Sequence, residues 1–299
     1  MGRRKYEYPP VMAPIASGPV VEISTPSLLD SYQMAQSWAK SFGDKLDAIR
    51  KIEKSIDHAD ARSSLWKRLE WLGSWARKRK EDWNTEANRL DCLRASTKNE
   101  AESMRLHTQF DVGDDGSPTW ARVVDAFEKL STAERIWDVT AHGGPDHSKS
   151  SASQLVQRHD VHFGVDSLPT VRPDIRSLRI VSANGPDIWI YPSMIAVGGL
   201  YDSPALVDLM EVQVSCAPKR FIEKEQLPSD ARQVGHTWRY INKDGGPDRR
   251  FSDNPQWPVM LYGEIDLKST GGLFERYHVS DIEKARQFAR CLTEHKATI

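Results

Sequence analysis

The chain has 299 residues, and its 41 lysines and arginines nearly balance 42 aspartates and glutamates, which leaves a net charge of −1. This balance excludes a polycationic protein that coats nucleic acid and also excludes an acidic tail protein. With 39 % hydrophobic residues the chain is too apolar for wholesale disorder, and its length suits two modest domains or one domain with an arm.

The cysteines and the apolar stretches bear on the compartment. Cys92, Cys216 and Cys291 are widely spaced, which is typical of a protein in a reducing environment. The basic start of the chain is not followed by the apolar core of a signal peptide. The most apolar stretch, residues 188–201, is interrupted by a proline and is too short to span a bilayer. We therefore expect a cytoplasmic protein with no membrane partner.

The first part of the chain has the pattern of two long helices. Residues 1–26 contain five prolines and are expected to form an extended N-terminal segment. Apolar residues then recur at heptad intervals on both sides of a breaker-like segment at 57–64, which predicts an antiparallel, coiled-coil-like helical hairpin over residues 27–110. The two predicted seams are Leu28, Tyr32, Ala35, Ala39, Phe42, Leu46, Ile49 and Ile56, and Leu65, Leu69, Leu72, Ala76, Trp83, Ala87 and Leu90.

The rest of the chain, residues 117–299, favours strands. Ser117 followed by Pro118 predicts the start of a short helix, and Asn184-Gly185 between two β-branched runs predicts a hairpin. Ser280 to Glu283 have the spacing of a capping box and begin an amphipathic C-terminal helix. The predicted class is therefore α+β: the helical hairpin, followed by an antiparallel β barrel or sandwich closed by the last helix. This element order resembles the pleckstrin-homology-like (PH-like) superfold.

Three segments carry a resemblance to a known family. They are RFIEKEQLPSDA (220–231), TWRYINKDGGPDRRF (237–251) and PVMLYGEIDL (258–267). These segments resemble a family of uncharacterised bacterial proteins that carry TWRY-NKDGGPDRRF and LYGEL segments, and the resemblance covers roughly residues 175–290. It implies an accessory gene of bacteria with a role in phage defence or in another mobile-element system. The helical hairpin lies outside the matched region.

The segment KDGGPDRR is a candidate anion-binding loop. Two glycines free backbone N–H groups to line a concave turn, basic side chains supply charge, and nearby aromatic rings offer stacking surfaces for bases. The alternative is a Gly-Gly-Pro-Asp turn whose arginines pair with neighbouring aspartates. The candidate residues for phosphate or nucleic acid are Lys243, Gly245, Gly246, Arg249, Arg250 and Trp238.

A second pattern concerns paired carboxylates. Pro247-Asp248 precedes Asp266-Leu267-Lys268, an order that resembles the PD-(D/E)xK arrangement of metal-dependent nucleases, where carboxylates hold Mg²⁺ and a lysine positions water. Residues two apart in a strand share a face, but the same alternation is typical of the solvent face of a half-buried strand. Mg²⁺ is therefore a cofactor only under a nuclease alternative, whose catalytic residues would be Asp248, Glu264, Asp266 and Lys268.

Histidines gather in the middle of the chain. His142, His147, His159 and His162 lie close enough in sequence to suggest zinc. In a strand, however, His159 and His162 would point to opposite faces, and the glycine-rich surroundings favour surface histidines. We therefore predict no metal site.

The second helix of the hairpin carries a basic run interleaved with tryptophans. The tryptophans do not share one face, so some leave the seam and either pack on the body or form an exposed patch for a partner. Basic helices with tryptophans also contact nucleic-acid phosphates and membrane surfaces. The candidate partner-binding residues are Trp66, Trp71, Trp75, Arg77, Lys78, Arg79 and Lys80.

No phosphate-binding loop, nucleophile elbow or cysteine-based zinc motif occurs in the sequence. We therefore favour a non-catalytic interaction, assembly or sensor subunit that binds another protein and needs no cofactor. A homodimer paired through the helical seams is one arrangement of such a subunit. The nuclease and the binding of nucleic acid or phosphate through KDGGPDRR are the alternatives.

Overall fold

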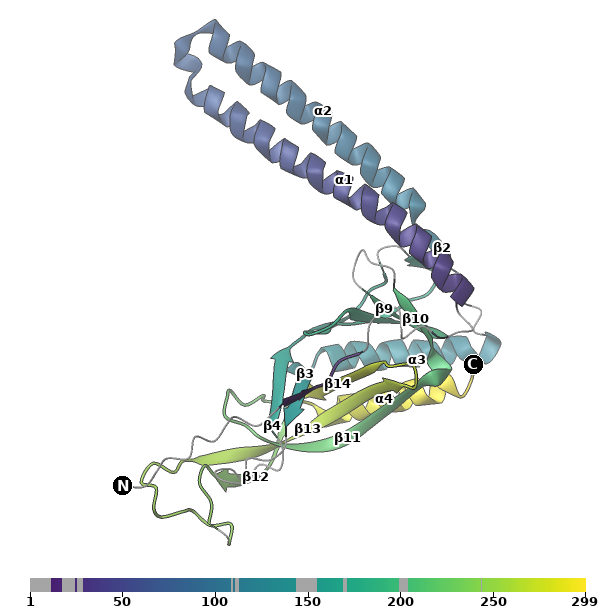
Figure 1. Ribbon diagram of the computed structural model, residues 1–299, viewed down its shortest axis with the longest axis vertical. Helices are drawn as coiled ribbons and strands as arrows, with labels where there is room; N and C mark the ends of the chain where they lie inside the picture. Colours follow the sequence, from purple (N-terminus) through teal and green to yellow (C-terminus); the bar gives the residue numbers. More distant parts are fainter. Residues whose placement is uncertain are drawn as a thin grey trace.

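The protein is described by a computed structural model for residues 12–17, 25, 29–108, 110, 113–143, 155–168, 171–198, 204–242 and 244–299. It has a long helical arm at one end and a body of sheets and helices at the other (Figure 1). The predicted α+β class, with a helical N-terminal region and antiparallel sheets, is confirmed.

The arm consists of α1 (Leu29–Arg68), the short helix η2 (Glu70–Leu72) and α2 (Ser74–Met104). The two long helices run antiparallel, and ion pairs Lys45–Glu100 and Lys98–Glu53 link α1 to the last part of α2. At about 1.5 Å per residue, α1 is about 60 Å long. The turn between the helices therefore lies at the end of the arm farthest from the sheets (Figure 1).

The predicted seam is only partly right. Phe42, Ile49 and Ile56 are buried, and Phe42 and Ile49 form a cluster with Ala101 of α2. The predicted breaker at 57–64 is wrong, because this segment contains neither glycine nor proline and α1 continues through it. The chain turns instead at Gly73, whose φ of +99° disfavours other residues. Leu65 and Leu72, assigned to the second seam, are exposed at this turn.

Within the described residues, the body contains three sheets. Only the smallest, formed by β2 (Leu106–Thr108) and β6 (Val171–Pro173), is parallel. A five-stranded sheet consists of β5 (Phe163–Val165), β7 (Leu178–Ile180), β8 (Asp187–Ile190), β9 (Met194–Gly198) and β10 (Ala205–Asp208). A seven-stranded sheet consists of β1 (Met12–Pro14), β3 (Ile136–Gly143), β4 (Leu155–Asp160), β11 (Val212–Ile222), β12 (Arg232–Trp238), β13 (Gln256–Ser269) and β14 (Phe274–Val279).

These sheets are open in the described part of the chain, and none closes into a barrel. The hairpin predicted at Asn184-Gly185 is confirmed, because β7 and β8 pair antiparallel on its two sides. A further short helix, η3 (Leu209–Glu211), separates β10 from β11.

Two helices share one core with both large sheets. They are α3 (Gly113–Ser131) and α4 (Ile282–Lys296). Phe127 of α3 stacks on Phe163 of β5 and also contacts Phe288 of α4. The helix α3 begins before the predicted start at Pro118, since a proline near a helix start removes only one early hydrogen bond. Asp281, not Ser280, caps α4 by accepting from two backbone N–H groups.

The base of the arm is anchored in the body. The guanidinium of Arg105 donates to the carbonyl of Val171 at 2.9 Å, and β2, which follows α2 in the chain, pairs with β6.

Among the described residues, no helix combines the length and the hydrophobicity that a membrane span requires.

Candidate functional site

The segment predicted as an anion site is a closed turn between β12 and β13. The side-chain oxygen of Asn242 accepts from the backbone N–H groups of Asp244 and Gly246, and its carbonyl accepts from Gly245. Gly245, with a φ of +80°, permits this geometry. The amides that an anion would need are therefore already used within the loop, which favours the turn alternative.

The charged side chains of this loop fit the same alternative. Arg250 holds Asp248 through two nitrogens, and this contact lowers the pKa of the Asp248 carboxyl. The ring of Phe251 stacks on Tyr240 at 4.0 Å between centroids. Trp238 is half-buried and Arg249 is exposed, while Lys243 lies outside the described residues.

The four residues of the nuclease alternative do not meet. Asp248 lies in the loop that precedes β13, past the end of the strand that begins at Gln256. Glu264 lies eight residues farther along β13, in the opposite direction. Eight extended residues span on the order of 26 Å, which is far beyond the reach of a shared metal ion. Among the described residues, no group of three or more His, Cys, Asp or Glu side chains is arranged to hold a metal. The geometry therefore gives the nuclease alternative no site.

Glu264, Asp266 and Lys268 do share one face of β13, as the alternation predicts, but this face is not the solvent face that we expected. Both carboxylates are mostly buried and lie opposite β14, where Arg276 bonds Asp266 at 2.6 Å and His278 bonds Glu264 at 3.0 Å. We call these five side chains the charge ladder.

The two carboxylates of the charge ladder are paired with cations. Burial alone would raise the pKa of Glu264, but the bond from His278 and the charges of Arg276 and Lys219 lower it to about 2. Lys268 and Arg276 together lower the pKa of Asp266 against its burial. Carboxylates held so firmly by cations are structural partners, and they have no tendency to take up a proton near neutral pH.

Two buried polar groups escaped the sequence analysis. The first is Arg158 of β4, whose guanidinium lies 4.0 Å from the ring centres of both Trp137 and Phe221 and pairs with the buried carboxylate of Glu223. The hydroxyl of Tyr262 also donates to Glu223 at 2.8 Å. No sequence pattern joins these residues, because they come from four separate segments.

The second group is a buried acidic pair. Glu275 and Asp138 are fully buried on neighbouring strands, and each has one carboxylate oxygen without a hydrogen-bond partner. Burial, with the nearby charge of Asp138, raises the pKa of Glu275 to about 7. Its other oxygen accepts from the N–H and hydroxyl of Ser17. The alternation of β14 gives a signal for this placement, since Glu275 shares a face with the core residues Tyr277 and Val279.

The histidines and cysteines within the described residues do not come together as a metal site. His142 lies on β3 and His159 on β4, but their register partners are Val156 and Asp138 rather than each other. His162 is exposed in the loop after β4, and His147 lies outside the described residues. Cys92 is exposed and Cys291 is buried, and burial raises the pKa of the Cys216 thiol to about 11, which makes it a poor nucleophile.

Four of the large apolar side chains that are exposed in the described chain lie together at the far end of the arm. We call residues 65–80, at the turn between α1 and α2, the arm tip. Trp71 is 78 % exposed, and Trp75 is 55 % exposed although its ring meets that of Trp66 edge-on at 4.9 Å. Leu65 and Leu72 are 44 % and 47 % exposed. Large apolar side chains gathered in this way mark a contact surface.

The arm tip is also strongly basic. It holds six lysines and arginines against one acid, Glu70, which Lys80 pairs at 2.6 Å. Within the described chain, no acidic side chain comes within ion-pairing distance of the other five. They are Lys67, Arg68, Arg77, Lys78 and Arg79, and all five are exposed.

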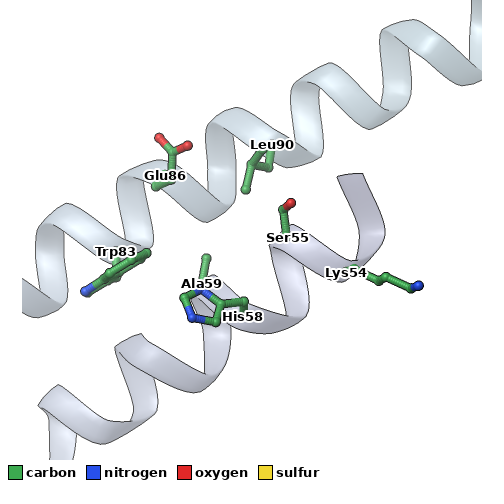
Figure 2. A pocket seen from close by; sticks show the side chains of 7 residues that line it. All are labelled: Lys54, Ser55, His58, Ala59, Trp83, Glu86 and Leu90. Carbon is green, nitrogen blue, oxygen red and sulfur yellow. The ribbon is translucent and has the colours of Figure 1, made fainter. Parts of the chain in front are cut away.

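A shallow hollow lies lower on the arm (Figure 2). It measures about 320 Å³ and is lined from α1 by Lys54, Ser55, His58 and Ala59 and from α2 by Trp83, Glu86 and Leu90. The ring of Trp83 contacts that of His58 at 5.7 Å. Trp83 therefore packs within the arm, unlike the exposed Trp71 of the arm tip.

Comparison of the chain with protein-family models, with curated proteins and with solved structures finds no match.

Proposed function

We propose that this protein is a non-catalytic interaction or assembly subunit whose arm presents the arm tip to a partner. The observation that carries the proposal is the exposure of Trp71 and Trp75 at the end of a long helical hairpin anchored at its base. Exposing large apolar side chains to water is unfavourable, and a partner that covers them removes this cost. Aromatic side chains with arginines are also the residues that contribute most to binding surfaces.

The proposal agrees with the state of the polar side chains in the body. The carboxylates considered for catalysis are paired with the cations Arg250, Arg276 and Lys219. A role in phage defence, a PH-like body, a coiled-coil arm and a homodimer remain predictions from the sequence within this proposal.

Site-specific cross-linking in the native host tests the proposal. A photoreactive phenylalanine analogue replaces Trp71 in one variant and Leu93, which is 48 % exposed midway along α2, in a matched control. We expect a discrete cross-linked product, with either protein or lipid, at position 71 and none at position 93. Equal products at both positions, or none at 71, would contradict the proposal.

Catalysis is tested separately with plasmid DNA and Mg²⁺ or Mn²⁺. We expect no cleavage by the wild-type chain. Cleavage that disappears in Asp266→Asn, a variant that keeps the shape of the side chain, would instead establish an enzyme.

A further inference from the structure

We propose that the arm tip docks on the surface of a membrane rich in anionic lipid. This inference rests on the proposed function and names the surface that the arm contacts. The expectation of no membrane partner came from the lack of a spanning segment, and a tip that lies in the lipid headgroups needs no span. Three features of the arm tip support a lipid surface.

The first feature is shape. Trp71 and Leu72 lie in and beside the turn itself, so the apolar side chains form the convex end of a structure two helices thick. The hollow of Figure 2 is lined by residues farther down the arm and is not part of this end. A protein partner would need a preformed concave pocket for such an end, whereas a lipid surface deforms around it.

The second feature is the order of apolar and basic residues along the arm. Lys67 and Arg68 end α1, and Arg77 to Arg79 follow the first turn of α2, directly behind the apolar turn on both helices. With a rise of about 1.5 Å per residue, residues 77–79 lie about 5–8 Å behind Ser74. Interfacial helices bury apolar side chains to about 5–10 Å, so the basic groups would reach lipid phosphates while the apolar end enters the acyl boundary.

The third feature is the composition of the exposed apolar side chains, which favours lipid over nucleic acid as the partner. Single-stranded nucleic acid is held by aromatic rings on which bases stack. Half of the exposed apolar side chains of the arm tip are leucines, which offer no such ring, and the ring of Trp75 already contacts Trp66. Tryptophan and leucine backed by lysine and arginine are the composition of an interfacial anchor.

Vesicle co-sedimentation of the full chain tests this inference. The probes are large vesicles of phosphatidylcholine alone and of phosphatidylcholine mixed with phosphatidylglycerol. We expect the chain to sediment with the mixed vesicles and binding to fall as salt rises, because salt screens the basic groups. In the double variant Trp71→Ser, Trp75→Ser we expect the partition coefficient to fall about tenfold or more, since two large side chains lose their apolar environment.

Two control variants separate the arm tip from the rest of the arm. Leu93→Ser removes an exposed apolar side chain away from the turn and should leave vesicle binding unchanged. Lys78→Glu with Arg79→Glu should weaken binding about tenfold or more, whereas Lys51→Glu with Arg89→Glu, at exposed positions lower on the arm, should not. Circular dichroism of each variant verifies that the helices are retained.

The inference is overturned if the chain does not sediment with the mixed vesicles or if it binds both vesicle types equally. It is also overturned if the arm-tip variants bind the mixed vesicles as well as the wild type does. A protein cross-linked at position 71 without vesicle binding would uphold the proposed function and reject the membrane. Binding of a single-stranded oligonucleotide that requires Trp71, without vesicle binding, would also reject the membrane.

Discussion

Glu275 illustrates how much the surroundings of one carboxyl group matter in this body. It lies on a core-facing position of β14, and two groups of Ser17 donate to one of its oxygens. The other oxygen has no hydrogen-bond partner, and Asp138 lies on the next strand. Charging this side chain is therefore unfavourable, because a buried carboxylate needs more donors than it has here.

We expect the stability of the body to fall as pH rises from about 4.5 to about 7. The folded protein holds a proton on Glu275 up to a pKa of about 7, while the unfolded chain releases it near 4.5, so the unfolded state gains stability in this window. Glu275→Gln removes the titration and should raise the free energy of unfolding by about 3 kcal/mol at about pH 8, with little change at about pH 5.

Urea unfolding at these two pH values measures the effect. Glu225→Gln changes an exposed carboxyl and serves as the control, since it should alter neither value. An equal pH dependence in Glu275→Gln and the wild type would show that Glu275 stays ionised in the fold.

Glu264 has the opposite electrostatics. Its pKa of about 2 lies below that of the unfolded chain, so its contribution to stability is present above about pH 4.5 and is lost as pH falls towards 2. Glu264→Gln leaves Arg276 and His278 with an uncharged neighbour and should lower the free energy of unfolding by about 2–3 kcal/mol at neutral pH. A urea midpoint that is the same in Glu264→Gln and in the wild type would show that the charge of Glu264 does not stabilise the fold.

At the scale of elements, the turn of the arm depends on Gly73. Its φ of +99° and ψ of −161° belong to a region that only glycine occupies readily, and an added Cβ would meet no atom within 4 Å. The cost of a side chain there is therefore purely conformational.

Gly73→Ala should destabilise the arm by about 1–3 kcal/mol, measured by thermal unfolding followed with circular dichroism. Gly164→Ala, at a site with equally open space and no positive φ, should have little effect. A similar loss in both variants would assign the effect to something other than the turn.

Local sequence patterns predict which helices and hairpins form in this fold better than they predict where a helix ends or which strands pair. Heptad spacing predicts the helical region, and Asn184-Gly185 predicts the β7–β8 hairpin, because both signals lie within one segment. The end of α1 was misplaced because polar residues at 57–64 were interpreted as a breaker, although they are compatible with a helix. The pairing of β1, β3 and β14 depends on contacts between distant segments, which one sequence does not reveal.

The same distinction applies to the candidate site. Trp71 and Trp75 were predicted as partner-binding residues because their spacing takes them off the seam, and their exposure agrees with that prediction. Arg158, Asp138 and Glu275 were missed, since alternation assigns a residue to a face but does not say which side chains meet there. The carboxylates of β13 were assigned to the correct common face but to the wrong environment.

At the scale of the molecule, the arm leaves and re-enters the body at one place, so its length is independent of the core. Deleting one heptad from each helix, residues 50–56 and 92–98, keeps every remaining side chain on its original face. The arm should shorten by about 10 Å. We expect a smaller radius of gyration by small-angle X-ray scattering and an unchanged near-ultraviolet spectrum of the body, and loss of that spectrum would show that the body depends on the full arm.

The bonds between Ser17 and Glu275 join residues 258 positions apart, whereas the arm pairs neighbours across one turn. On the ribosome, the nascent chain exposes both arm helices long before β14 emerges, so the arm can form early, whereas Ser17 has no acceptor until Glu275 has been made. A chain released before residue 275 would lack β14, which leaves residues 136–138 of β3 without their strand partner and open to pairing with another chain.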